Sequence, residues 1–147
     1  MTLSLDTNIL VYAYQSSDPA KQVVAMDCLQ KISMRDCNIA GQVLSEFMNT
    51  GHKKRLISLD LARQACRILE AEFAVCEQNV DDRINASKLS ESRKIQFYDA
   101  LLISTLARSG VKILLSEDLA DGDTYDGVRV LNPFNPANAA RIEAALH

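Results

Sequence analysis

The stretch "FYDALLISTLARSGVKILLSED", residues 97–118, determines the fold class. Residues 97–108 have a helical pattern and are apolar on nearly every side after Asp99, so we expect a buried helix. Gly110 then ends the helix. The apolar "VKILLS" that follows has the length and composition of a buried strand. A buried helix that leads directly into a buried strand favours the α/β class.

The same alternation continues along the rest of the chain. We expect further strands at "TLSL", "CNIA", "FAVCE" and "VRVLNPF". We expect helices after Asn8, over residues 19–32 and 42–54, after Ser58, and over residues 81–91 and 136–145. In the helix that Ser58 would cap, the residues expected to face inward are Leu61, Ala65, Ile68 and Leu69, with Arg63 and Arg67 facing out. Short apolar strands between helices predict a mostly parallel sheet that is covered on both faces.

The composition is that of one folded domain over residues 1–147. Hydrophobic residues make up 48% of the chain and charged residues 24%, and the net charge of −3 argues against a protein that coats polyanions. The four cysteines are scattered without metal-ligand spacing, so zinc binding is not expected. The opening "TLSL" does not look like a signal peptide, and the longest apolar run is too short to span a membrane. We therefore expect a cytoplasmic protein.

Ordinary structural roles can explain the position of each of four acids taken alone, but not the four positions together. Asp6 and Asp118 each follow a predicted strand, at the sheet edge where α/β proteins place their active crevice. Glu46 borders the apolar stripe of its helix, and Asp99 shares a face with buried residues in the first turn of the most apolar helix. Helix capping, a packed stem with a solvated head, or the helix dipole could account for each acid alone.

Together the four acids predict a metal site. No comparable supply of inward-facing Lys or Arg accompanies them. Two like charges about 4 Å apart repel by about 4 kcal/mol at an effective dielectric near 20, so clustered carboxylates need protons or a cation. A site made only of carboxylate oxygens suits Mg²⁺ or Mn²⁺, and such an ion supports phosphodiester cleavage.

The motifs "LDTNILVYAY", "QVLSEF", "FYDALLIS" and "LLSEDL", in this order and spacing, resemble the PIN-domain ribonucleases, and most of all the VapC-like toxins of bacterial toxin–antitoxin pairs. The resemblance implies a three-layer α/β/α sandwich that cleaves RNA with Mg²⁺ or Mn²⁺. It also implies an antitoxin partner and a homodimer. Matched by position, the acidic quartet that would bind the metal is Asp6, Glu46, Asp99 and Asp118, and the supporting polar residues are Thr7, Asn8 and Ser116.

The segment "LLSEDLADGDTYDG", residues 114–127, departs in part from the family pattern. Ala120 stands where many members have a further acid. Asp121 comes one residue later and is a candidate residue that supports the site without binding the metal directly. We expect Glu117 to point away from Asp118 toward solvent or a partner. Asp123 and Asp126 lie beside Gly122 and Gly127 and are predicted to be turn residues.

Two basic clusters are candidate contacts for RNA phosphates. Lys53, Lys54 and Arg55 close the helix that carries Glu46, while Arg93 and Lys94 precede the helix that carries Asp99. The helix dipole alone could also explain cations at a helix C-terminus, and both explanations stay open for the first cluster.

Three other functions fit the sequence less well. A phosphatase of the haloacid-dehalogenase type needs a second acid two residues after the first, and the chain has Asn8 there. A calcium loop of the EF-hand type, counted from Asp118, would place Gly122 one position early and Arg129 where the bidentate Glu belongs. A catalytically inactive interaction module remains as an alternative, although the presence of all four acids argues against it.

Overall fold

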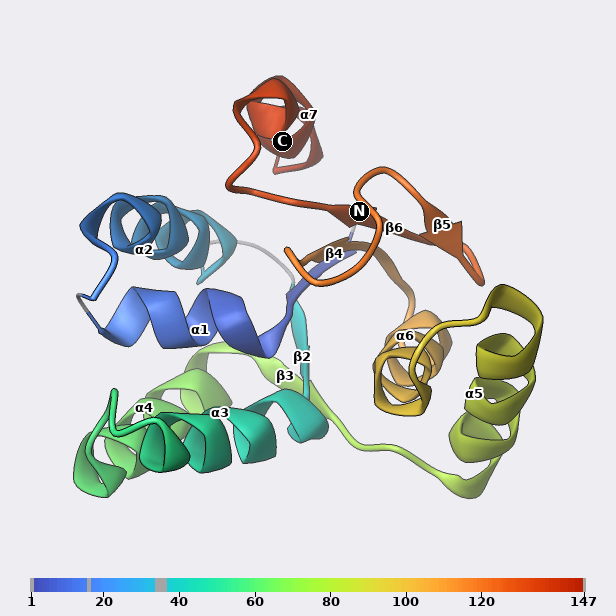
Figure 1. Ribbon diagram of the computed structural model, residues 1–147, viewed down its shortest axis with the longest axis horizontal. Helices are drawn as coiled ribbons and strands as arrows, with labels where there is room; N and C mark the ends of the chain where they lie inside the picture. The colour runs from blue at the N-terminus through green and yellow to red at the C-terminus, as the bar shows by residue number, and fades with distance from the viewer. Residues whose placement is uncertain (1, 16, 34–36, 147) are drawn as a thin grey trace.

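The computed structural model describes residues 2–15, 17–33 and 37–146 as strands alternating with helices (Figure 1). The strands are β1 (Thr2–Leu5), β2 (Asn38–Ala40), β3 (Ala74–Cys76), β4 (Val111–Leu115), β5 (Thr124–Tyr125) and β6 (Val128–Leu131). The helices are α1 (Thr7–Tyr14), α2 (Pro19–Ser33), α3 (Gly41–Lys53), α4 (Leu59–Glu72), α5 (Val80–Arg93), α6 (Phe97–Arg108) and α7 (Ala139–Ala145), the last preceded by a 3₁₀ turn at Pro136–Asn138. The predicted alternation of strands and helices is confirmed.

The central sheet is mostly parallel, as predicted. Its strand order is β1-β4-β6-β5, with β4 parallel to both β1 and β6 and only β5 antiparallel. Strands β2 and β3 form a second parallel pair, and a bridge between Leu3 and Cys37 connects this pair to β1. Because β1 and β4 run in the same direction and pair Leu5 with Leu115, their carboxyl ends lie side by side.

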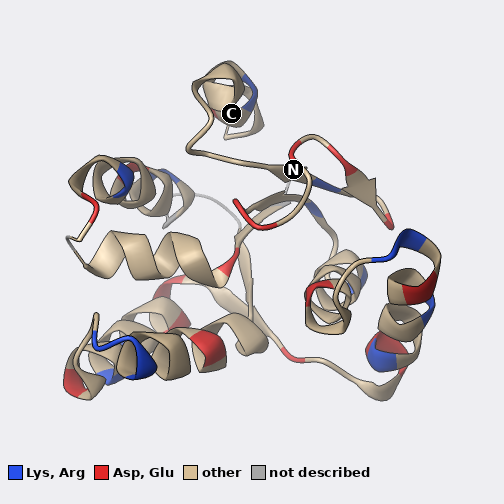
Figure 2. Ribbon diagram, viewed as in Figure 1, with Lys and Arg blue, Asp and Glu red and all other residues tan. Residues whose placement is uncertain are grey.

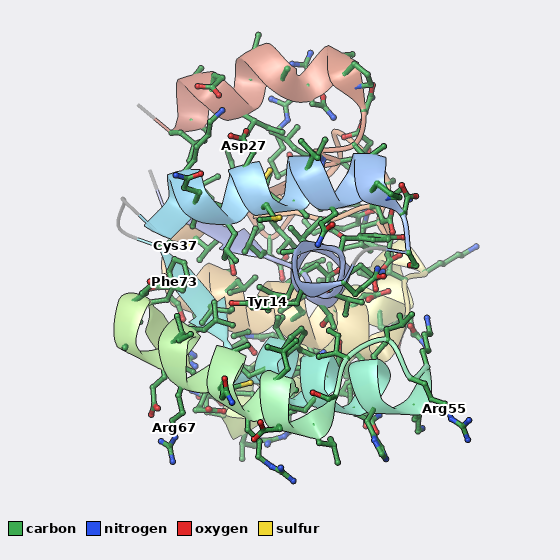
Figure 3. The ribbon with its side chains drawn as sticks, turned by 90° about the vertical axis from the view of Figure 1, so that its left-hand side faces the viewer. Tyr14, Asp27, Cys37, Arg55, Arg67 and Phe73 are labelled. Carbon is green, nitrogen blue, oxygen red and sulfur yellow. The ribbon has the colours of Figure 1, made fainter. Side chains whose placement is uncertain are left out.

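Helices cover both faces of the strands, which gives the expected three layers. Figure 1 shows α5 and α6 on one side of the sheet and α1 to α4 on the other. The view in Figure 3 shows α7, α2 and α1 stacked above α3 and α4. The buried core between these layers is almost entirely aliphatic, with Phe47 as its largest fully buried side chain.

Local signals fix several helix ends. Ser58 accepts a hydrogen bond from the amide of Leu61 and so caps α4 as expected. Asn79 and Asp82 form a reciprocal capping box at the start of α5, and Asp82 also pairs with Arg108 of α6. Gly110 has a φ of +85°, a left-handed conformation that disfavours side chains, and it separates α6 from β4.

One detail of the predicted packing was wrong, and one strand was not predicted. Leu61 and Ile68 were expected to face inward, but they are 39% and 52% exposed, and Ala62 is buried instead. The buried residues of α4 are Ala62, Ala65 and Leu69, and the helix contacts α3. Strand β5 was not predicted: it is a two-residue strand joined to β6 by a tight turn at Asp126 and Gly127, both with positive φ.

The cysteines and the lengths of the helices bear on two further expectations. All four cysteines are free thiols; Cys28 and Cys37 are buried, whereas Cys66 and Cys76 are only partly covered. Among the residues described, none of the helices combines the length and the apolar character needed to cross a membrane.

Candidate active site

Four separate elements carry the four predicted acids toward the carboxyl ends of β1 and β4. Asp6 follows β1 directly and caps α1, and its amide donates to the carbonyl of Leu115 at 2.9 Å. Asp118 lies in the loop after β4, Glu46 is in the middle of α3, and Asp99 is in the first turn of α6. Figure 2 shows acidic positions in each of these elements near the middle of the molecule.

Asp6 is the buried centre of this region, with an exposed fraction of 5%. One carboxylate oxygen accepts from the amide of Thr7 at 2.7 Å, and the other accepts from the hydroxyl of Ser116 at 2.8 Å. Burial raises the pKa of Asp6 to about 6, against the effect of these two hydrogen bonds; the charges of Asp118 and Asp99 raise it further. The surroundings of Asp6 therefore disfavour its charged form unless a cation is present.

Glu46 is held from two sides. Its Oε2 accepts from the hydroxyl of Thr7 at 2.8 Å, and its Oε1 accepts from the side-chain amide of Gln42 at 3.0 Å. The same Gln42 nitrogen donates to the backbone carbonyl of Tyr98 at 3.0 Å, one residue before Asp99. A continuous path of hydrogen bonds and short backbone links thus runs from Asp6 through Glu46 to the first turn of α6.

Asp118 and Asp99 complete the electrostatic cluster. Asn8 donates its side-chain amide to Asp118 Oδ2 at 2.7 Å, and the amide of Asp118 donates to Ser116 Oγ at 3.2 Å. Although Asp118 as a residue is exposed, partial burial of its carboxyl is the largest cause of its raised pKa, followed by the charge of Glu117. Partial burial also raises the pKa of Asp99, and the charges of Asp118 and Glu46 add to this effect.

The oxygen-only set of donors fits a hard divalent ion in its chemistry. The charges of Asp99, Asp118 and Glu46 each raise the pKa of at least one other acid of the quartet, so the four acids share one electrostatic region. Among the described residues, however, no three His, Cys, Asp or Glu side chains are arranged closely enough to hold an ion. The hydrogen bonds of Asp6, Glu46 and Asp118 instead occupy their oxygens with neighbouring donors.

Two lysines act electrostatically on Asp118. The positive charges of Lys54 and Lys21 lower its pKa, against the net rise. Lys21, on α2, forms an ion pair with Glu117 at 2.8 Å and lies over the rings of Tyr12 and Phe134. The expectation that Glu117 is solvated or faces a partner was therefore wrong, because Glu117 instead anchors the loop after β4 to α2.

The other predicted basic residues differ in their surroundings. Arg93 is engaged in contacts within the chain: it donates to the carbonyl of Thr124 and lies over the ring of Tyr125. Lys94 ends α5 in a left-handed conformation. Lys53 is exposed, and Figure 3 shows Arg55 pointing out of the molecule. Of the five candidates, Lys54 has the clearest connection to the acids.

The remaining acids of the loop after β4 have structural roles. Asp121 accepts hydrogen bonds from the amide of Asn132 and from the side chains of Asn135 and Asn138. These contacts secure the segment that leads to α7, and they occupy both oxygens of Asp121. Asp126 forms the predicted turn with Gly127.

Sequence reasoning missed Gln42 and Lys21. The spacing of four residues between Gln42 and Glu46 is the signal that could have revealed the first contact, because such residues are neighbours on a helix surface. The partnership of Lys21 with Glu117 joins residues 96 positions apart and has no local signal.

The chain belongs to the PIN domain family, whose pattern matches residues 3–120. No curated protein sequence matches the chain. The recognition of the PIN family from the four sequence motifs is therefore confirmed.

Solved structures of toxin–antitoxin proteins have the same fold. VapBC2 from Rickettsia felis, bound to a promoter DNA fragment, has a TM-score of 0.65 at 17% identity, covering 90% of this chain and 98% of that one. A toxin–antitoxin complex from Klebsiella pneumoniae has a TM-score of 0.62 at 19% identity, with the same coverage. VapC20 from Mycobacterium tuberculosis, described as a sarcin-ricin loop cleaving toxin, has a TM-score of 0.63 at 17% identity over 79% of this chain and 91% of that one.

Proposed function

We propose that this chain is a metal-dependent endoribonuclease and the toxin of a toxin–antitoxin pair. The observation that carries the proposal is the electrostatic cluster of Asp6, Asp99, Asp118 and Glu46 at the carboxyl ends of β1 and β4. A set of neighbouring carboxylates, three of which have a raised pKa, at this edge of an α/β sheet is suited to bind a divalent cation.

In this proposal the residues of the site have different roles. Asp6, Asp99 and Asp118 would hold Mg²⁺ or Mn²⁺, which would neutralise charge on the phosphate and lower the pKa of the attacking water. Glu46 would orient that water, and Thr7 and Gln42 hold its carboxylate in place. Ser116 and Asn8 would keep Asp6 and Asp118 at the edge of the sheet.

The likeness to VapC20 supports RNA as the substrate, because that protein is described as a toxin that cleaves the sarcin-ricin loop. The complexes from Rickettsia felis and Klebsiella pneumoniae support an antitoxin partner. We further propose that the chain forms a homodimer. In the alternative, in which the chain is an inactive interaction module, the same acids would bind no metal ion.

Calorimetric titration with MgCl₂ and MnCl₂ separates the two functions. The nuclease should bind one of the ions at a saturable site, and Asp99→Asn should weaken that binding, because it removes a charged ligand. Asp60→Asn is the matched control, since Asp60 is also an acid in the first turn of a helix. An absence of saturable binding to the wild-type protein would reject the nuclease in favour of the interaction module.

A further inference from the structure

We propose that Gln42 is a positioning residue for the metal-binding acids, fixing Glu46 relative to the first turn of α6. This inference rests on the proposed function and extends it to a residue outside the acidic quartet. The side-chain amide of Gln42 donates to Glu46 Oε1 and to the carbonyl of Tyr98, both at 3.0 Å. Gln42 therefore connects two helices that carry different acids of the cluster.

The two hydrogen bonds use the full donor capacity of the Gln42 side chain. A primary amide has two N–H groups, and here one partner is a carboxylate and the other a backbone carbonyl. An Asn would be one methylene shorter, a Glu would offer no donor when ionised, and an apolar side chain would offer none at all. The geometry thus requires the donors of this particular side chain.

The acceptor side of Gln42 points to the same conclusion. Its amide oxygen is buried and has no hydrogen-bond partner among the described residues. A buried acceptor without a partner destabilises the fold. The hydrogen bonds of the Gln42 side chain therefore all lie on its donor side, toward Glu46 and α6.

Gln42 also opposes a specific repulsion. Burial is the largest cause of the raised pKa of Asp99, followed by the charge of Asp118, and the charge of Glu46 adds to both, so Glu46 and Asp99 repel. Gln42 attaches Glu46 to the backbone beside Asp99, and Thr7 holds the other Glu46 oxygen at 2.8 Å. Two donors from different elements thus keep this carboxylate close to the other acids in the absence of a cation.

The variant Gln42→Met removes both donors and nearly preserves side-chain volume. We expect it to weaken Mn²⁺ binding by about 10-fold to 100-fold in calorimetry, the range for residues that orient metal ligands. Gln64→Met is the matched control, because Gln64 on α4 also donates to an acid one helical turn away, Asp60, at 3.0 Å. Gln64→Met should bind Mn²⁺ as the wild type does.

The double variant Gln42→Met/Glu46→Gln distinguishes positioning from general structural support. If Gln42 acts through Glu46, adding Gln42→Met to Glu46→Gln should weaken Mn²⁺ binding by much less than it does in the wild type. Equal weakening in both backgrounds would overturn the proposal, as would unchanged binding by Gln42→Met. Circular dichroism of each variant confirms that the helices are intact.

A measurement on the wild-type protein keeps the proposal testable if Gln42→Met does not fold. In a Mg²⁺ titration followed by NMR, the side-chain amide signals of Gln42 should shift with the same midpoint as the calorimetric binding, while those of Gln64 should not. Mg²⁺ binding without any shift at Gln42 overturns this inference alone. No site-specific binding of either ion overturns the proposed function, and this inference with it.

Discussion

The hydroxyl of Ser116 donates a hydrogen bond of 2.8 Å to Asp6 Oδ2, joining the residues that follow two neighbouring parallel strands. Ser116 is fully buried, and its oxygen also accepts from the amide of Asp118. One side chain therefore ties the positions of two acids to the edge of the sheet. The strand pairing of β1 with β4 sets this arrangement before any ion binds.

Replacing Ser116 with Ala should destabilise the protein by about 1–3 kcal/mol, because it leaves a buried carboxylate oxygen without its donor. It should also raise the pKa of Asp6 further, since the hydrogen bond from Ser116 lowers that pKa. Urea unfolding measures the first effect, and NMR titration of the Asp6 carboxyl measures the second.

Ser4→Ala is the control for this prediction. Ser4 is also a fully buried serine, on β1, but its hydroxyl has no hydrogen-bond partner among the described residues. Its removal should leave stability unchanged or raise it. Equal destabilisation by both variants would contradict the role given to Ser116.

The pKa of Asp6 predicts how stability without metal depends on pH. Because the folded protein raises this pKa from 3.8 to about 6, the folded state binds the proton more tightly than the unfolded state does. The stabilising contribution is complete below pH 3.8 and is lost as pH rises through 6. A shift of this size corresponds to about 3 kcal/mol.

Asp6→Asn lacks this titration, so it isolates the effect. Relative to the variant, the wild-type protein should lose unfolding free energy between pH 4 and pH 6.5 in a chelating buffer. Chemical denaturation across this range measures the difference. A constant difference would show that Asp6 titrates normally in the folded protein.

Much of the fold could be predicted because its signals are local. The bounds of α6 agree with residues 97–108, and the Ser58 cap and the Asp126–Gly127 turn follow from residue preferences over a few positions. Strand β5 was missed because two residues carry no periodicity. Ile68 was misplaced because the pattern of a helix defines an apolar face but not how much of it a neighbour covers.

The candidate site could likewise be predicted only in part from the sequence. The positions of Asp6 and Asp118 follow from strand ends, which the sequence reveals. The partners that hold the acids depend on tertiary contacts: Thr7 reaches Glu46 across 39 residues, and Gln42 reaches the Tyr98 carbonyl across 56. Such contacts leave no spacing in the chain that sequence reasoning could use.

Lys54 should contribute to binding of the RNA backbone. It is exposed at the end of α3, and its charge acts on Asp118. Lys54→Gln should weaken binding to single-stranded RNA and reduce its logarithmic salt slope by about 0.7, the value for one lost phosphate contact. Fluorescence anisotropy with EDTA measures binding without cleavage.

Arg67→Gln serves as the charge-matched control. Arg67 is an exposed residue of α4 that pairs with Glu70, and Figure 3 shows it and Arg55 in different regions of the molecule. This variant should leave both the affinity and the salt slope unchanged. If Lys54→Gln also leaves the affinity and the salt slope unchanged, the lysine at the end of α3 only complements the helix dipole.

Cleavage of total RNA by the wild-type protein and by Asp99→Asn tests the central claim most directly. The substitution nearly preserves the size of the side chain and removes one charge from the acidic cluster. The wild-type protein should cut RNA when Mg²⁺ or Mn²⁺ is added and stop when the ion is chelated. Asp99→Asn should fold normally and show no cleavage above background. Cleavage by Asp99→Asn at the wild-type rate would contradict the assignment of these acids as a metal-dependent nuclease site.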